Sequence, residues 1–328
     1  MKPRFMLSLC ASRALAVWLG LSGAAVAQPA PQFTGYQFLT TREMLLRLSA
    51  SNGLDYRIDA STNLAQWNGL LTLLSTGMYQ HTDSAAPYLA SRYYRALQLI
   101  GTNHVTGDHL VTTNGDVVIH PVNHASLALS WNSKMIYVDP ANKSFSGLPK
   151  ADLILFSHDH SDHFNAGATS GYTNTNATII APQIVYNGLA SYPSLRSLTT
   201  VLTNGMSTNA LGLLIEAVPA YNFTAPNHPR GVGNGYVLNI GGRRVYISGD
   251  TEDIPEMRAL TNIDVAFLAM NRPYTMYVTQ AVSAVRAFRP KVVYPYHYQP
   301  SSPATDLNYF KQEVMTNPGV EVRIRKWY

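Results

Sequence analysis

Ser157-His158-Asp159-His160-Ser161-Asp162-His163-Phe164-Asn165 is the stretch that decides the fold. It follows the apolar residues 151–156, which are typical of a buried strand. In an extended segment, side chains alternate between two faces, so His158 and His160 point the same way and can hold one ion. Asp162 and His163 follow where the chain turns, and they can face a second ion. The spacing therefore predicts two neighbouring metal sites.

The residue types indicate which metal to expect. Neutral imidazole nitrogens and a carboxylate oxygen suit zinc, at about 2.0–2.2 Å each. The alternative is a solvated histidine-rich loop whose aspartate caps the next helix. The whole chain has 10 histidines, and three of them in this spacing behind an apolar strand favour the metal site. Four ligands cannot complete two tetrahedral sites, so further ligands must come from elsewhere.

Two later apolar stretches end in residues of the same kind. Residues 243–247 lead into Asp250, and residues 291–294 lead into His297. Taken alone, Asp250 could be a turn or helix-cap residue, and His297 could be a packed core histidine. Together with the first cluster, they indicate one catalytic rim at one edge of the sheets. Asp139, which is followed by proline, is predicted to lie in a turn rather than to bind metal.

The pattern from residue 102 onward is that of an α/β domain. Short apolar stretches alternate with longer connections, as expected for sheets that helices cover. The predicted strands are residues 116–120, 126–130, 134–138, 151–156, 178–181, 213–217, 235–239, 243–247, 264–268 and 291–294. One helix is predicted over residues 278–288, where apolar residues recur at helical spacing before Pro290.

Several motifs carry a family resemblance that spans about residues 105–300. "SHDHSDHFN" is similar to the HxHxDH signature of the metallo-β-lactamase superfamily. "VYISGDTEDIPEM" (245–257) and "VVYPYHY" (292–298) resemble the later metal motifs of its ascorbate-6-phosphate-lactonase-like branch, which also contains the N-acylphosphatidylethanolamine phospholipase D. "HPVNHASLAL", "IYVDP" and "AYNF…NHPRGVGNGYVL" resemble other parts of that branch. The resemblance implies an αββα sandwich with the site at one edge.

The resemblance also implies a set of metal ligands. It assigns three histidines to one metal, three residues to the other and a bridging role to Asp250; the two sets are His158, His160 and His228, and Asp162, His163 and His297. It further places His124 and Tyr274 near the substrate, although a buried structural role suits His124 equally well.

His228 needs an argument of its own. Many members of the superfamily have a histidine where this chain has Asn222, and an amide oxygen is a poor zinc ligand beside imidazoles. His228 lies in a nearby loop between two prolines, Pro226 and Pro229, and we expect it to supply the third imidazole. The alternative is that His228 only covers the pocket and that water fills the position.

The predicted activity is hydrolysis. Two divalent cations about 3.5–4 Å apart can share a water, lower its pKa and deliver a bridging hydroxide to an electrophilic carbonyl or phosphorus. Asp162 and Asp250 are the candidate catalytic residues, as proton relays or simply as ligands. The expected substrate is a small-molecule ester, lactone, amide or phosphodiester, since the fold alone does not select the bond.

Two other functions compete with a hydrolase. An iron-based redox protein of this fold typically has a glutamate where His160 stands, which argues against that function. A cell-envelope binding protein with a vestigial metal site is the second alternative, and the intact ligand set argues against it.

The residues before 102 form two segments. Residues 28–101 are predicted to be a small β-sandwich-like module, and "YRIDASTNLAQW" with "SRYYRA" resembles fibronectin type III. Residues 1–27 are typical of a signal peptide, with three basic residues, a short apolar run and small residues before a cleavage point near Ala27. The alternatives are a frayed amphipathic start and a retained anchor, but the run is shorter than the roughly 20 residues that span a bilayer. The hydrolase domain is then 102–328.

Charge and hydropathy limit the partners. The chain has 24 basic and 19 acidic residues, and removing three basic residues with the signal peptide leaves a net charge of +2. No basic stripe of the kind that tracks phosphates is present, so nucleic acid is not expected. No later stretch is apolar enough for a membrane span. The sequence does not indicate an oligomeric state.

Export is the first testable expectation. In cells that express the full chain, fractionation with N-terminal sequencing should find protein outside the cytoplasm that begins near Gln28, because signal peptidase cuts after small residues. An uncleaved cytoplasmic product would contradict this localisation.

Overall fold

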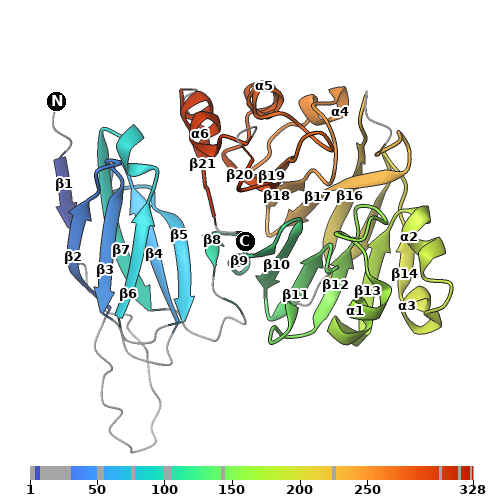
Figure 1. Ribbon diagram of the computed structural model, residues 1–328. Coiled ribbons are helices and arrows are strands. Elements are labelled where there is room, and N and C mark those ends of the chain that lie inside the picture. Colours follow the sequence, from blue (N-terminus) through green and yellow to red (C-terminus); the bar gives the residue numbers. More distant parts are fainter. Residues whose placement is uncertain are drawn as a thin grey trace, which may run out of the picture. The chain divides into compact units, whose positions relative to one another are not determined.

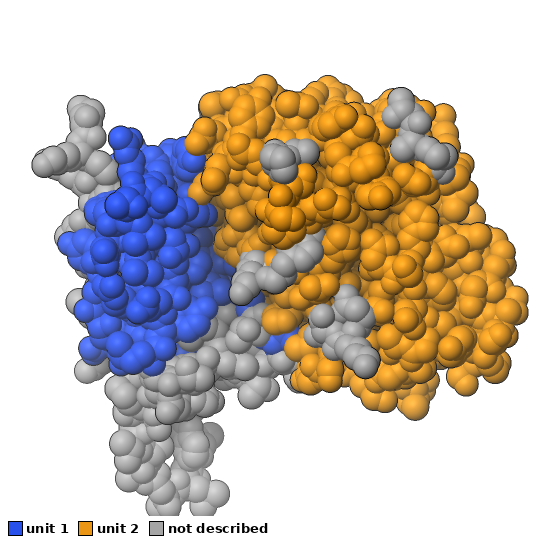
Figure 2. Space-filling view, in the orientation of Figure 1, with its two compact units in different colours: residues 1–111 blue, residues 112–328 orange. Residues whose placement is uncertain are grey.

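The computed structural model describes residues 4–7, 31–49, 55–74, 78–98, 105, 107–141, 145–223, 227–302, 305–316, 319–325 and 327. The chain folds as two compact units, Met1–Val111 and Thr112–Tyr328, shown in blue and orange in Figure 2. Most of the expected signal peptide, including Cys10, lies outside the described residues. The domain limits at residues 27 and 101 therefore stay predictions.

The first unit is built of strands, as expected. One sheet has the order β1-β7-β4-β5 and the other the order β2-β3-β6 (Figure 1). The strands are β1 (Arg4–Leu7), β2 (Gln32–Phe38), β3 (Met44–Ser49), β4 (Asp55–Ser61), β5 (Asn68–Leu74), β6 (Met78–Asp83), β7 (Ser91–Gln98) and β8 (Asp108–Leu110), with a 3-10 turn at Ala86–Tyr88. Alternate residues of β3 and β4 face one core; its members include Met44, Leu46, Leu48, Tyr56, Ile58 and Ala60.

A buried ion pair joins two strands of the first unit. Arg92 Nε donates to Asp83 Oδ2 at 2.7 Å, and the Tyr94 hydroxyl donates to the same oxygen at 3.0 Å. Both charged side chains are almost fully buried. Burial alone would raise the pKa of Asp83, but Arg92 outweighs it and holds that pKa below its ordinary value. The pair therefore stabilises the unit above the ordinary aspartate pKa of about 3.9, and its contribution is lost as the pH falls through the lowered value.

The second unit is a sandwich of two sheets. Within this unit the first sheet has the order β14-β13-β12-β11-β10-β9, and the second has the order β15-β16-β17-β18-β19-β20-β21. The first comprises β9 (Val117–Asn123), β10 (Ser126–Trp131), β11 (Lys134–Val138), β12 (Ala151–Leu155), β13 (Thr173–Ala181) and β14 (Thr199–Val201). The second comprises β15 (Ser207–Ala210), β16 (Leu213–Ala220), β17 (Gly233–Ile240), β18 (Arg243–Ile247), β19 (Val265–Met270), β20 (Val292–Tyr298) and β21 (Glu321–Val322).

Helices cover the outer faces of both sheets. They are α1 (Ala166–Tyr172), α2 (Gln183–Gly188), α3 (Pro193–Ser197), α4 (Pro255–Arg258), α5 (Val278–Phe288) and α6 (Leu307–Met315). Figure 1 shows α1, α2 and α3 beside the first sheet and α4, α5 and α6 beside the second. The expected αββα sandwich is confirmed, and α5 covers the predicted range 278–288 because its apolar stripe packs inward.

The strand directions decide where a site can form. β11, β12, β13 and β14 run parallel to one another, and so do β18, β19 and β20. The carboxyl ends of neighbouring parallel strands meet at one edge, and loops there are the usual place for functional residues. The histidine-rich segment leaves β12 at that edge, and Asp250 follows β18.

The buried pair of the first unit gives a stability test. Asp83→Asn removes the carboxylate partner of a buried guanidinium, so the first unit should lose about 3–5 kcal/mol of unfolding free energy. Urea unfolding, monitored by near-ultraviolet circular dichroism, and scanning calorimetry would each measure the loss. Asp159→Asn, an exposed aspartate, is the matched control. Equal unfolding midpoints for the two variants would contradict the assignment.

Candidate metal centre

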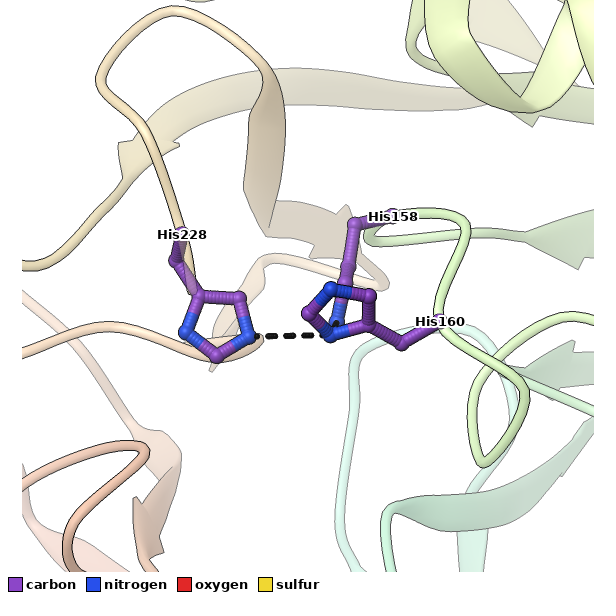
Figure 3. Close-up of side chains that lie close together, drawn as sticks. All are labelled: His158, His160 and His228. Carbon is purple, nitrogen blue, oxygen red and sulfur yellow. Dashed lines mark hydrogen bonds between the residues drawn. The ribbon is translucent and has the colours of Figure 1, made fainter. Parts of the chain in front are cut away.

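Three histidines from two loops converge on one point (Figure 3). His158 Nε2 lies 3.0 Å from His160 Nδ1, and His228 Nε2 lies 3.2 Å from the same His160 nitrogen. The three ligand atoms all lie within 4.8 Å of one another. Figure 3 shows the rings of His158 and His160 on one side and that of His228 opposite. We call His158, His160 and His228 the first trio.

A second group lies beside it. His163 Nε2 and His297 Nε2 are 3.0 Å apart, and Asp162 Oδ2 is 3.4 Å from His297 Nε2. We call Asp162, His163 and His297 the second trio. His124 lies beside the second trio, because His124 Nε2 is 3.2 Å from Asp162 Oδ2. The sequence-predicted ligands of each metal are thus brought together.

Asp250 lies between the two trios. Its Oδ1 is 3.4 Å from His163 Nε2, and its Oδ2 is 3.4 Å from His228 Nε2 and 3.3 Å from His297 Nε2. Gly249 makes this position possible: it has a left-handed φ of +60°, and a Cβ there would lie 2.8 Å from the Asn234 carbonyl oxygen. One carboxylate therefore reaches both groups.

The loop contacts of His228 fix its tautomer. Its Nδ1 lies 3.1 Å from Asn222 Oδ1 and 3.1 Å from the backbone oxygen of Tyr274. Both partners are acceptors, so the ring proton sits on Nδ1 and the lone pair of Nε2 faces the first trio. Asn222 thus stands behind His228 rather than in the ligand position. Residues 224–226 of this loop lie outside the described residues.

Asp139 orients His163, a role that the sequence analysis missed. It lies just after β11 with a left-handed φ of +47° and is fully buried. Its carboxylate accepts hydrogen bonds from the Ser157 amide at 2.7 Å, the Ser157 hydroxyl at 2.6 Å and His163 Nδ1 at 2.8 Å. The expected turn is present, and it aims the carboxylate at the outer nitrogen of His163, as partners behind metal ligands do.

A bulge in β20 turns His297 into the site. The register of β19 and β20 shifts at this residue, which has a left-handed φ of +46°. The Asn271 amide lies 3.3 Å from His297 Nδ1, while Asn271 Oδ1 is buried without a hydrogen-bond partner. A half-turn of that amide would let Oδ1 accept the Nδ1 proton, which satisfies the orphaned oxygen and frees Nε2 for a ligand.

The backbone near the end of the described chain holds this side of the site. Trp327 offers its carbonyl oxygen to the amides of His124 at 3.1 Å and Asn123 Nδ2 at 3.3 Å. The His124 carbonyl in turn accepts the His297 amide at 3.1 Å, and the two imidazole rings lie 3.9 Å apart. The sequence gives no side-chain signal for this role of Trp327, because its backbone makes the contact.

The charges of the groups are mutually compensating. Burial alone would raise the pKa of Asp250, but His297 and His163 outweigh it and hold that pKa well below its usual range. Burial alone would lower the pKa of His297, but the charge of Asp250 raises it to about 8. Burial also lowers the pKa of His158. The imidazoles around Asp250 therefore supply the positive charge that compensates it, and a metal that binds there must displace their protons.

The donor set fits a divalent metal. Asp250 Oδ1 is buried and has no hydrogen-bond partner among the described residues, although such oxygens are nearly always paired. The three imidazoles that face the Asp250 carboxylate, those of His163, His228 and His297, use their other ring nitrogens to contact Asp139, Asn222 and Asn271. Five imidazoles and two carboxylates with oriented lone pairs are the ligands of zinc and similar ions.

Tyr274 is placed differently from the other candidates. Its side chain is 44% exposed, and its backbone oxygen contacts His228 as described. The side chain therefore stands outside the ligand cluster, beside the loop that holds His228. Its expected contact with substrate stays a prediction.

Comparisons with known proteins identify the family of this fold. Residues 118–297 match the family described as the beta-lactamase superfamily domain. A UPF0173 metal-dependent hydrolase of Thermococcus onnurineus (strain NA1) is 32% identical over 211 residues, which cover 60% of this chain and 92% of the relative. A crystal structure of a protein named as a metal-dependent hydrolase, from Parabacteroides distasonis ATCC 8503, is 41% identical and covers 67% of this chain and 97% of its own, with a TM-score of 0.60. Igni18, a metallo hydrolase of Ignicoccus hospitalis, is 25% identical over 64% of this chain and 95% of its own, with a TM-score of 0.54.

The loop contacts predict different outcomes for two neighbouring substitutions. His228→Ala removes a donor of the first trio, so metal content should fall by about one equivalent per chain. Asn222→Ala removes only a group behind the ring, so the content at saturation should stay while affinity drops about 10–100-fold. Metal analysis after dialysis against graded chelator measures both. The reverse pattern would assign the ligand to Asn222.

Proposed function

The chain belongs to the metallo-β-lactamase superfamily, within its UPF0173 metal-dependent hydrolases, and on this premise we propose that it is a dizinc enzyme that hydrolyses a small-molecule ester, lactone, amide or phosphodiester. The chain shares its family and its class, metal-dependent hydrolase, with these relatives. The number of metals, their identity and the bond that is cut are the proposed part.

The position of Asp250 carries the proposal of two metals. A single carboxylate that lies 3.4 Å from a nitrogen of each trio can bridge two ions, and one ion would leave half of the buried donors without a partner. Zinc suits five imidazoles and two carboxylates better than magnesium or calcium, which prefer oxygen ligands. His160 stands where iron-based redox members of the fold typically carry a glutamate, which supports hydrolysis over redox chemistry.

The metal pair, when bound, supplies Lewis acidity and an activated water. The chain's own residues then determine how water and substrate reach the metal centre and which group transfers protons. His163, Asp250 and His297 are buried, whereas His160 and Asp162 are exposed. Water and substrate therefore reach the centre from the side of His160 and Asp162.

Asp162 is the carboxylate placed to exchange a proton with solvent. Its side chain is 46% exposed, and Oδ2 lies 3.2 Å from His124 and 3.4 Å from His297. Burial alone would raise the pKa of Asp162, but hydrogen bonds to His124 and His297 lower it, so the group stays ionised and, as a weak base, passes a proton on rather than keeping it. Asp250 is sealed from solvent and is suited to holding charge in place.

The other proposals concern the setting of the enzyme. We infer export with cleavage near Ala27, a small-molecule substrate and no nucleic-acid partner, from the sequence features given above. Within the described part of the chain, no helix has the length and hydropathy to cross a membrane. The ascorbate-6-phosphate-lactonase-like branch remains an expectation from the motifs. A binding protein with a vestigial site is disfavoured, because a decayed site would lack donors that this one retains.

Metal analysis and an activity screen test the proposal together. The purified protein should contain about two zinc equivalents and should cut at least one of four probes, an ester, a lactone, an amide and a phosphodiester. His160→Ala and Asp250→Asn should each lower kcat/KM at least about 100-fold, because each removes a ligand. Asp159→Asn, in the same loop but exposed and outside both trios, should retain activity. A protein that holds no metal even after zinc is added would overturn the proposal.

A further inference from the structure

A hollow lies at the same edge of the sandwich as the metal centre. It has a volume of about 220 Å³ and is lined by residues after β13, residues after β14 and the start of β17. Whole sites for drug-sized ligands measure roughly 300–1,000 Å³, so this hollow suits one part of a substrate rather than all of it. We call it the amide pocket, after Gln183, Asn187, Asn204 and Asn234 in its lining.

Strand order places the amide pocket next to the first trio. β13 and β14 are the parallel strands that follow β12 in the first sheet, and their carboxyl ends lie along the edge from which His158 projects. The opposite wall is formed by Gly231, Val232 and Asn234, which closely follow His228 in the chain.

The wall of the pocket touches the metal loop directly. The Asn234 amide donates to the Ser157 carbonyl oxygen at 2.9 Å. At Gly233 the backbone packs so closely that an added Cβ would lie 3.6 Å from the Cβ of His158. A group bound in the amide pocket is therefore one backbone segment away from a ligand of the first metal.

The inner wall is fixed by hydrogen bonds between amides. Asn234 is buried, and its Nδ2 donates to the Leu202 carbonyl at 2.7 Å. Asn204 Nδ2 donates to the Gly233 carbonyl at 2.8 Å and to Asn234 Oδ1 at 2.7 Å. The pocket is thus formed before a ligand arrives, which lowers the entropy lost on binding.

The lining carries polar groups but no charge. None of the residues that line it is acidic, basic or histidine. Gln183 Nε2 donates to Asn187 Oδ1 at 2.8 Å, which leaves Gln183 Oε1 as an acceptor and Asn187 Nδ2 as a donor without partners among the described residues. A neighbouring acceptor and donor complement a group that both donates and accepts, as amides and hydroxyls do.

We propose that the amide pocket binds an uncharged, amide- or hydroxyl-bearing part of the substrate while the scissile bond lies at the metal centre. The proposal rests on the hydrolase function proposed above. It narrows the substrate class, since a carboxylate or phosphate at this end of the substrate would find no cation among the lining residues to pair with. Leu202 and Val232 add apolar surface beside the amides, which suits the carbon skeleton of such a group.

Nuclear magnetic resonance titration tests the pocket without turnover. The zinc-loaded full chain, labelled with nitrogen-15, is titrated with N-acetylglycinamide and with its carboxylate counterpart N-acetylglycine. The neutral probe should shift the side-chain amide signals of Gln183 and Asn187 saturably. Its Kd should be at least about threefold lower than that of the charged probe, the worth of about one neutral hydrogen bond.

Two lysine variants serve as test and control. Asn187→Lys adds a cation at an exposed position of the lining, so it should reverse the order of the two probes. Asn209→Lys makes the same change on an exposed position of β15 outside the lining and should leave the order as in the parent protein. Absence of shifts at Gln183 and Asn187, or equal Kd values for the two probes, overturns the proposal. If the enzyme is active but the probes fail in this way, only the proposal for the amide pocket is refuted. If the probes bind as expected but the protein cuts none of the four bond types, the proposed hydrolase function is refuted and the pocket proposal stands.

Discussion

Asp250 brings a negative charge to a place where only 4% of its surface meets solvent, and much of the second unit is arranged around that charge. A buried carboxylate is costly unless opposite charge and hydrogen bonds compensate it. Here the compensation comes from imidazoles of β20, of the loop after β12 and of the loop before β17. The two sheets must therefore pack face to face, with these loops at one shared end of the sandwich, for the charge to be tolerated.

Residues behind the ligands make this arrangement specific. Asp139, Asn222 and Asn271 each contact the outer ring nitrogen of one histidine, so the inner nitrogens face a common point. Asp139, His124 and His297 also have left-handed backbone conformations, which direct their side chains toward the site. Such conformations are rare outside glycine and collect at functional sites, where surrounding structure holds them. The site is thus positioned by backbone geometry as much as by its side chains.

The sequence predicts the parts of this site that are local. His158, His160, Asp162 and His163 lie together directly after an apolar strand, and Asp250 and His297 follow strands too, so composition and spacing suffice to find them. His228 follows no strand directly, and only a family resemblance indicated it. The role of Asp139 depends on His163, which lies 24 positions further along, and a strand end before proline does not reveal that partner.

The fold shows the same division. Period and apolar runs predict the sandwich and α5, because burial of one face leaves a regular pattern in the sequence. The bulge at His297 leaves no such pattern, since a single left-handed residue changes neither hydropathy nor period.

The carbonyl of Trp327 has a consequence for the order of assembly. Asn123 and Trp327 are 204 positions apart, so the ribosome makes the histidine-rich loop long before the residue that secures the turn at His124. The His124 and His297 side of the site therefore takes this geometry only in a chain whose last strands have docked, unlike zinc fingers, where the ion organises the chain.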